Sequence, residues 1–392
     1  MKENLSGTFF VAVVLAGLAV GPMVRGEDIV VSTSDDLRAA IGRAGPGTTI
    51  KLAPGRYSGG FSLEEIVGRH DAPVILAGID SGNPPVLSGG HEALHLSDCR
   101  HVVIRDIKVS GSPVNGINAD DGGTFDTPSR HLLFERVTIE NTGGVGNHDA
   151  LKLSGVDNFT VRDCTFRGWG GSAIDMVRCQ DGRIEDCSFH GAPGFSQSTG
   201  IQMKGGTTRI AVVRSFFRDA GNRAVHIGGQ TDPDCFRPGV PDYEAKDIVV
   251  AGNRFVGSDA VIAWVTADGG HVHHNTIVLP SQWVLRILQE TAAPRFAPCR
   301  GGVFEDNLIV YDGNVRASVN VGPGTTPGSF VFRRNAWYRA DGPTKVRLPA
   351  PEQDGVYGVD PKLVNSRSRD MTVTSLDPRI AHAGADRYRE AP

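Results

Sequence analysis

A six-residue pattern recurs along most of this chain and constrains its fold more than any other feature. The pattern is apolar-x-x-(Asn, Cys, Ser or apolar)-x-apolar, and successive copies begin 22 to 38 residues apart. The nine copies are IRDIKV (104–109), FERVTI (134–139), VRDCTF (161–166), IEDCSF (184–189), VVRSFF (212–217), VAGNRF (250–255), VHHNTI (272–277), FEDNLI (304–309) and FRRNAW (332–337). A variable period with a constant minimum indicates a unit of fixed size that carries loops of different length.

A second short strand accompanies each copy of the pattern. These tetrads are ALHL (93–96), GINA (116–119), ALKL (150–153), AIDM (173–176), GIQM (200–203), AVHI (224–227), VIAW (261–264), VLRI (284–287) and SVNV (318–321). Alternate side chains of an extended strand share a face, so two apolar residues of each tetrad point one way and the residue between them points the other way. Parallel strands stacked in register would bury these pairs together.

A unit of about 22 residues with two or three short strands predicts an all-β, single-domain right-handed parallel β-helix. One coil cannot bury its own apolar pairs, so the coils must stack. Asparagines at the fourth position of the pattern are then expected to hydrogen-bond along the stack as a ladder. A β-sandwich also has many short strands, but it gives no reason for nine copies of one pattern.

The start of the chain is typical of a secretory signal. Lys2 precedes an apolar run over residues 9–21 that is short for a membrane span, although a membrane anchor is the alternative. We therefore expect residues 1–26 to be a signal peptide, and the mature protein to be secreted or periplasmic and free of the membrane.

The remaining chain divides into three parts. Residues 27–92 would hold an N-terminal cap and the first coils, residues 93–345 the repeats, and residues 346–392 a last coil, a cap and a tail. Residues 34–41 (SDDLRAAI) predict an N-capped helix whose apolar face covers the open end of the stack. With 40 basic and 44 acidic residues, the charge of −4 argues against nucleic acid as a partner. Nothing in the sequence indicates a dimer, so we expect a monomer.

The outward position of each tetrad predicts a groove along the rod. Adjacent coils place these side chains about 5 Å apart. In order they are His95, Asn118, Lys152, Asp175, Gln202, His226, Ala263, Arg286 and Asn320. Lys204 lies on the same face as Gln202, two residues further along. A mixed-charge groove suits a chain polymer with carboxylates, whereas the alternative is a solvated polar face with a Lys152–Asp175 salt bridge.

Two segments carry a family resemblance. SDDLRAAIGRAGPGTTIKLAPGRYSGGF (34–61) resembles the opening of secreted pectin-lyase-like β-helix proteins, in particular the alginate lyase and chondroitinase B family of polysaccharide lyases. STGIQMKGG (198–206) resembles the strand that carries the catalytic lysine of that family, which implies that Lys204 is the base. The family arginine above it would fall near Gly228, where the nearest basic groups are His226 and Arg223. Calcium, which acidic residues of that family bind, stays open, because no residue here is assigned to it.

These features together predict a lyase that cleaves an anionic, uronate-containing polysaccharide by β-elimination. A cation neutralises the uronate carboxylate while a neutral Lys or His removes the neighbouring proton. The expected catalytic residues are Lys204 as base, His226 as base or acid partner, and Arg223 or Arg286 as the neutralising cation. The expected substrate-binding residues are Lys152, Asp175, Gln202, Arg286 and Asn118.

Two alternatives stay open on the same scaffold. A glycoside hydrolase needs two carboxylates across the bond, and only Asp175 is placed securely in the groove, with Asp149, Asp232, Asp234 or Glu290 as further candidates. An epimerase belongs to the same alternative. The other alternative is a non-catalytic carbohydrate-binding or surface protein.

Two loops, 229–246 and 289–302, would enlarge the groove wall. Each holds one cysteine, Cys235 and Cys299, and we predict a disulfide between them. Cys164 and Cys187 share a position on adjacent coils and are expected to point inward. No Cys/His spacing indicates a zinc site, and no metal ligand is assigned.

Overall fold

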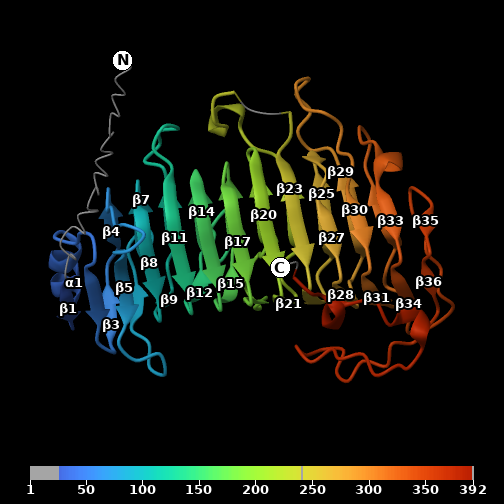
Figure 1. Cartoon of the computed structure of the whole chain (residues 1–392), viewed down its shortest axis with the longest axis horizontal. Helices are drawn as coiled ribbons and strands as arrows, with labels where there is room; N and C mark the ends of the chain where they lie inside the picture. The colour runs from blue at the N-terminus through green and yellow to red at the C-terminus, as the bar shows by residue number, and fades with distance from the viewer. Residues whose placement is uncertain (1–25, 240–241, 391–392) are drawn as a thin grey trace, which may run out of the picture.

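The structure is a computed structural model that describes residues 26–239 and 242–390. In this part of the chain three parallel sheets run side by side along a rod (Figure 1). From β2 to β32 each coil contributes a strand to sheet A, then to sheet B, then to sheet C, with the short β26 as an extra strand of sheet A, and every strand pair within the sheets is parallel. The predicted fold class, a single all-β body of stacked parallel coils, is confirmed.

The strands have the following bounds. Sheet A contains β1 (Asp28–Val31), β2 (Thr49–Leu52), β5 (Val74–Gly78), β8 (Arg100–Arg105), β11 (Ser129–Glu135), β14 (Val156–Arg162), β17 (Gln180–Glu185), β20 (Thr207–Val213), β23 (Ala245–Ala251), β26 (Ala267–Asp268), β27 (His271–His273), β30 (Val303–Glu305), β33 (Val331–Arg333) and β35 (Glu352–Gln353). Sheet B contains β3 (Arg56–Ser58), β6 (Val86–Ser88), β9 (Lys108–Ser110), β12 (Thr138–Thr142), β15 (Thr165–Trp169), β18 (Ser188–His190), β21 (Phe216–Arg218), β24 (Arg254–Val256), β28 (Thr276–Val278), β31 (Leu308–Tyr311), β34 (Ala336–Arg339) and β36 (Val356–Tyr357). Sheet C contains β4 (Phe61–Glu64), β7 (Leu94–Ser97), β10 (Ile117–Asp120), β13 (Leu151–Ser154), β16 (Ser172–Val177), β19 (Thr199–Lys204), β22 (Arg223–Gly228), β25 (Ala260–Val265), β29 (Trp283–Leu288) and β32 (Ala317–Val321).

The repeated six-residue pattern forms the corner between sheets A and B. In the first copy β8 ends at Arg105 and β9 begins at Lys108, with Asp106 and Ile107 between them. Asp106 has a φ of 55°, a left-handed conformation in which an aspartate is tolerated better than most residues. This conformation turns the chain, so that Ile107 at the fourth position points into the core and is buried.

The fourth position becomes an asparagine ladder in the later coils, as predicted. The side-chain amide of Asn253 donates to Asn275 Oδ1 at 3.1 Å, Asn275 donates to Asn307 Oδ1 at 3.0 Å, and Asn307 donates to Asn335 Oδ1 at 3.0 Å. All four side chains are buried. A buried amide costs free energy unless it is hydrogen-bonded, and each coil here supplies the partner for the coil before it.

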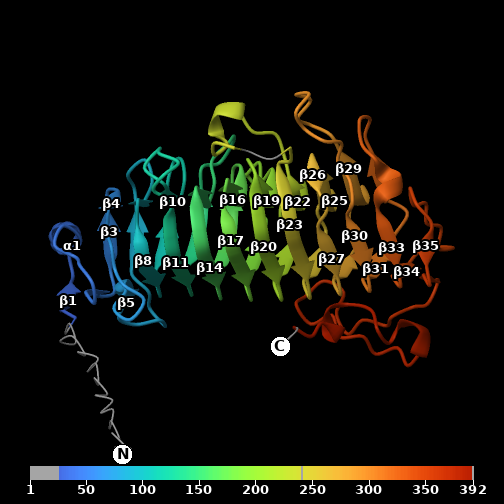
Figure 2. The same cartoon turned by 45° about the horizontal axis from the view of Figure 1, so that its top comes forward.

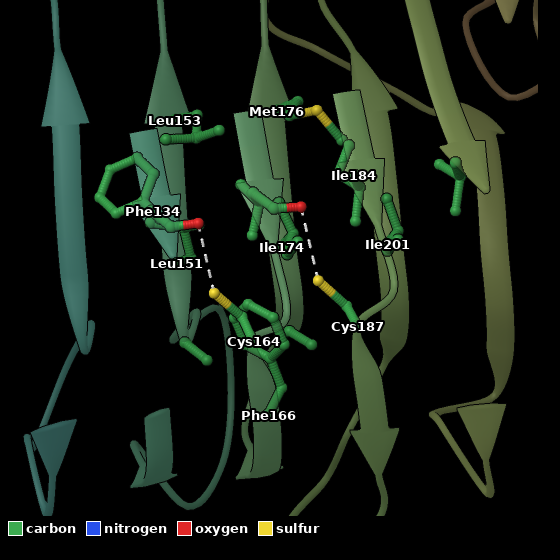
Figure 3. Packing of buried hydrophobic residues seen from close by; sticks show 14 of the residues in the cluster. Phe134, Leu151, Leu153, Cys164, Phe166, Ile174, Met176, Ile184, Cys187 and Ile201 are labelled. Atoms are coloured by element: carbon green, nitrogen blue, oxygen red, sulfur yellow. Dashed lines mark hydrogen bonds between the residues drawn. The ribbon is translucent and has the colours of Figure 1, made fainter. Parts of the chain in front are cut away.

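Apolar side chains from all three sheets fill the space inside the coils. Figure 3 shows Leu151, Ile174 and Ile201 of sheet C facing this interior. Cys164 and Cys187 are also buried in this core, and each thiol donates to a backbone carbonyl, that of Phe134 and of Val161 respectively. The prediction that these two cysteines point inward is confirmed.

The ends of the rod are covered in different ways. Helix α1 (Ser34–Ile41) lies at the N-terminal end (Figure 1), where it buries Leu37, Ala40 and Ile41 and contacts β1, β2 and β4. Thr33 caps it by accepting a hydrogen bond from the Asp36 amide at 3.1 Å. At the other end the stack finishes with β35 and β36, which lie in the segment expected to hold a last coil.

The segment after β36, residues 358–390, is here called the C-terminal segment. It runs back along the outside of sheet B, on the side of the rod opposite to the loops that follow β22 and β29 (Figure 2). Its Met371 is buried against Phe216, Val278 and Val310. The predicted signal peptide, apart from Gly26, lies outside the described residues. Within the described ranges, no helix has the length and apolar character needed to cross a membrane.

Candidate functional site

The outward side chains of sheet C form a single row in the predicted order, here called the outer row. Pairing in register joins His95 to Asn118, Asn118 to Lys152, Lys152 to Asp175, Asp175 to Gln202, Gln202 to His226, His226 to Ala263, Ala263 to Arg286 and Arg286 to Asn320. Successive members are therefore vertical neighbours, because adjacent strands of a sheet lie about 4.8 Å apart.

A pocket of about 550 Å³ opens over the middle of this row, here called the central pocket. Its floor belongs to β19, β22 and β29, and its walls come from the turns before these strands and the loops after them. The lining residues are Ser198, Thr199, Gln202, Asn222, Arg223, His226, Gln230, Asp259, Gln282, Trp283, Arg286 and Glu290. The volume falls in the range of ligand sites, and the lining is polar except for one aromatic ring.

His226 is the titratable group best suited to accept a proton in this pocket. It is only 3% exposed, and Arg223 Nη1 lies 3.0 Å from its Nε2. Burial lowers the pKa of His226 well below its ordinary value, and the positive charges of Arg223, Lys204 and Arg286 lower it further. The imidazole is therefore neutral near pH 7 and acts as an acceptor.

The two arginines of the pocket differ in their partners. Arg223 Nη2 donates to Glu290 Oε1 at 2.7 Å, so its charge is already paired. Arg286 instead donates from Nε to Asn320 Oδ1 at 3.0 Å, and its guanidinium lies 4.6 Å from the ring centroid of Trp283. Among the described residues no carboxylate forms an ion pair with Arg286. Arg286 is thus the cation that a ligand carboxylate can pair with.

A buried ion cluster lies next to the central pocket, formed by Asp149, Lys152, Asp175 and Lys204. Both ammonium groups pair with Asp175, which is fully buried, and Lys204 Nζ lies 3.3 Å from its Oδ1. Burial alone would raise the pKa of Asp175, but the two lysines outweigh it and hold the pKa below its ordinary value. Burial, and then the charge of Asp175, raise the pKa of Asp149 to about 6.

Lys204 stands beside the central pocket and is not among its lining residues. The register between β19 and β22 shifts after Gln202, so that Met203 pairs with Gly228. The backbone of Gly229 then approaches the outer row closely: a Cβ there would lie 2.8 Å from Gln202 Nε2 and 3.4 Å from Lys204 Cβ. Backbone thus occupies the place where the family resemblance expects an arginine.

The central pocket collects four of the predicted site residues, Gln202, Arg223, His226 and Arg286. Lys152, Asp175 and Lys204 belong to the ion cluster instead. Asn118 lies further toward the N-terminal end, where its amide donates to Asp120 Oδ2 at 2.9 Å. The pocket also contains residues that the sequence analysis did not name as site residues: Ser198, Thr199, Asn222, Gln230, Asp259, Gln282 and Trp283. The sequence could have placed Trp283 in the groove, because strand pairing aligns Trp283 with Ala260, which in turn pairs with Arg223.

The predicted disulfide between Cys235 and Cys299 is not formed, and both residues are free thiols. Cys299 is fully buried in the core of the coil, whereas Cys235 is exposed in the loop after β22. Their side chains therefore face different environments. Within the described ranges, no three His, Cys, Asp or Glu side chains are grouped so as to hold a metal ion.

Glu244 holds the two loops together in place of a disulfide. Its fully buried carboxylate accepts hydrogen bonds from Thr231 Oγ1 and Thr291 Oγ1, both at 2.7 Å, and from the Gly205 amide at 2.7 Å. Thr231 belongs to the first loop and Thr291 to the second. Glu290, which pairs with Arg223 in the pocket, directly precedes Thr291. By holding Thr291, the Glu244 carboxylate therefore also fixes one wall of the pocket.

Comparison with known proteins places the fold. Residues 92–278 match the family model described as the right handed beta helix region. The chain is a right-handed parallel β-helix. No curated protein matches it significantly.

Solved structures that resemble this β-helix include enzymes and a viral protein. An alginate lyase from Paenibacillus sp. str. FPU-7 is 18% identical, with a TM-score of 0.55, and the match covers 76% of this chain and 98% of that chain. A PL6 family polysaccharide lyase from Pseudopedobacter saltans is 14% identical, with a TM-score of 0.54 over 88% of this chain and 99% of that chain. The tailspike protein of E. coli bacteriophage HK620 is 14% identical, with a TM-score of 0.56 over 82% and 61%. At these identities the likeness shows the fold alone.

Proposed function

We propose that this protein is a secreted lyase that cleaves an acidic, uronate-containing polysaccharide by β-elimination in the central pocket. The observation that carries the proposal is that one pocket contains both a neutral, buried His226 and Arg286, a cation without a carboxylate partner among the described residues. β-Elimination needs these two groups together: a base for the proton next to the carboxylate, and a positive charge for the carboxylate itself.

The chemistry follows from the placement of these groups. The uronate carboxylate pairs with Arg286, which stabilises the negative charge that develops when the C5 proton leaves. His226 takes that proton, the electron pair forms the C4–C5 double bond, the C4–O bond breaks, and the departing oxygen takes a proton from a solvent water. Trp283 supports the Arg286 guanidinium through a cation–π contact and so helps to hold it in place for the carboxylate. Lys204 is the alternative base, but its ammonium group is paired with Asp175, so we assign it an electrostatic role: its charge helps to keep His226 neutral.

The experiment compares the parent protein with a His226→Gln variant on alginate, polygalacturonate and glycosaminoglycans. Unsaturated ends are followed by their ultraviolet absorbance. We expect the variant to lose at least about 100-fold in rate, because general base catalysis contributes this much. The matched control is His95→Gln, which replaces another outer-row histidine five strands away and should keep the parent rate. Absence of unsaturated product from every polyuronate would contradict the proposal.

A glycoside hydrolase is the second candidate, because the central pocket also contains two carboxylates, Glu290 and Asp259. Hydrolysis by a carboxylate pair would release reducing ends without unsaturation. The same incubations, assayed for reducing ends, separate the two reactions. Binding without either product would instead favour a carbohydrate-binding protein.

A further inference from the structure

A second cavity lies directly beside the central pocket, at the turns that lead from sheet B into sheet C. Its volume is about 430 Å³, and we call it the turn pocket. Asn222 and Asp259 line both cavities, so the two are continuous. A chain bound in the central pocket can therefore extend over this edge of the rod into the turn pocket.

The two pockets differ in charge: the central pocket holds equal numbers of cations and carboxylates, whereas the turn pocket has an excess of carboxylates. The central pocket combines Arg223 and Arg286 with two carboxylates, one of which is already paired. The turn pocket contains three carboxylates, Asp219, Asp259 and Asp312, and one cation, Arg367, which comes from the C-terminal segment. A uronate carboxylate in the turn pocket would meet like charge, which costs free energy.

The remaining lining of the turn pocket suits a sugar without charge. Gln197, Asn222 and Asn314 offer amide donors and acceptors, and Leu279 and Pro280 add apolar surface. Ser258, which also lines it, has a buried Oγ without a hydrogen-bond partner among the described residues. An unpaired buried hydroxyl is costly, and a ligand hydroxyl can satisfy it.

We propose that the turn pocket is a binding subsite for an uncharged sugar residue adjacent to the uronate. The inference rests on the proposed function, because it takes the occupant of the central pocket to be a uronate. It narrows the substrate class to polysaccharides in which uronates alternate with, or are interrupted by, uncharged residues.

The test varies charge on an otherwise constant chain. Fully charged alginate and polygalacturonate oligosaccharides are compared with the same oligosaccharides after partial methyl esterification, which makes some residues uncharged. Hyaluronan oligosaccharides, which alternate a uronate with an uncharged amino sugar derivative, form a third probe. Binding to the full protein is measured by calorimetry, and unsaturated ends are measured separately.

We expect the parent protein to bind the partly uncharged chains roughly tenfold more tightly than the fully charged ones, since like charges in the turn pocket oppose the latter. The double variant Asp219→Asn, Asp312→Asn keeps the shape of the pocket and removes two negative charges. It should bind fully charged chains more tightly and lose most of the discrimination. The control Asp35→Asn, Asp71→Asn removes two exposed carboxylates near the N-terminal end, with side chains 96% and 78% exposed, and should bind as the parent does.

Equal affinity for charged and partly uncharged chains, unchanged in the Asp219/Asp312 variant, overturns the subsite even if unsaturated ends are formed. Discrimination that disappears in the variant supports the subsite even if no unsaturated ends are formed, in which case the proposed function fails alone. Absence of binding to every probe overturns both.

Discussion

Arg223 Nη1 lies 3.0 Å from His226 Nε2, within hydrogen-bond distance of a ring nitrogen that must then be unprotonated. The same guanidinium donates to Glu290 at 2.7 Å, so its position is fixed from the other side by the loop after β29. This arrangement keeps the imidazole neutral by geometry as well as by burial. The lowered pKa of His226, the proposed base, can be measured through the pH dependence of the activity.

The first prediction concerns the pH dependence of the activity. An ordinary histidine has a pKa of about 6.5, and a base must be unprotonated to act. Because the pKa of His226 is lowered, we expect kcat to stay level as the pH falls from 8 through about 6. Replacing Arg223 by Leu removes one cause of the lowering, so the acidic limb should move to higher pH. The pH–rate profile measures the pH at which kcat begins to fall, and this pH can be compared between the variant and the parent even if their maximal rates differ. A limb near pH 6.5 in the parent would argue against His226 as the base.

The second prediction concerns the buried ion cluster. Asp175→Ala leaves the ammonium groups of Lys152 and Lys204 without their shared buried partner. Removing one member of a buried ion pair costs about 3–5 kcal/mol, so the free energy of unfolding should fall by this amount. Asp181→Ala is the control, since Asp181 pairs with Arg209 at the surface and such pairs contribute below about 1 kcal/mol. Denaturant unfolding measures both, and equal effects of the two substitutions would refute the structural role of the cluster.

The third prediction concerns the asparagine ladder. Asn275→Ala removes the acceptor of the Asn253 backbone and side-chain amides and the donor to the Val250 carbonyl, and leaves the buried Asn253 N–H without a partner. We expect a loss of about 2–4 kcal/mol in the free energy of unfolding, because each unsatisfied buried group costs about 1–3 kcal/mol. Asn83→Ala, on an exposed turn, should change it by less than about 0.5 kcal/mol. A loss at Asn275 no larger than that at Asn83 would mean that the ladder does not stabilise the stack.

The fourth prediction concerns the free thiols. Cys235 is exposed, whereas burial raises the pKa of Cys299 to about 11. A thiol reagent at pH 8 should therefore modify Cys235 quickly in the folded protein and Cys299 only after unfolding. Mass spectrometry of the labelled peptides identifies the sites. The Cys235→Ser variant should show no fast labelling, and an unreactive Cys235 in the native protein would instead point to a disulfide.

The sequence predicted the order of the outer row because two simple rules determine it. Alternation within a strand decides that Gln202 and His226 point outward, and one-to-one pairing of parallel strands decides that they are neighbours. The contents of the central pocket depend on more than these rules. Asn222 and Asp259 come from turns of different length, and the path of a turn does not follow from periodicity.

Two further differences have specific physical causes. Lys204 was expected beside Gln202 and diagonal to His226, but it pairs with Asp175 and does not line the central pocket. The register between β19 and β22 shifts after Gln202, and the two consecutive glycines of β22 and its following loop were the available signal for this irregularity. The disulfide prediction used the position of the two loops in the chain and could not tell that Cys299 faces the core.

The coil-by-coil construction gives this protein an uneven tolerance to insertions and deletions. Extra residues in the turns around the central pocket would reshape its walls while His226 and Arg286 stay where they are, so new specificity can arise there at little structural cost. A single residue added within β22 would instead reverse the facing of every side chain beyond it and could send the imidazole into the apolar interior. In this scaffold, changes in length are therefore tolerated in the turns, whereas the lengths of the strands must be kept.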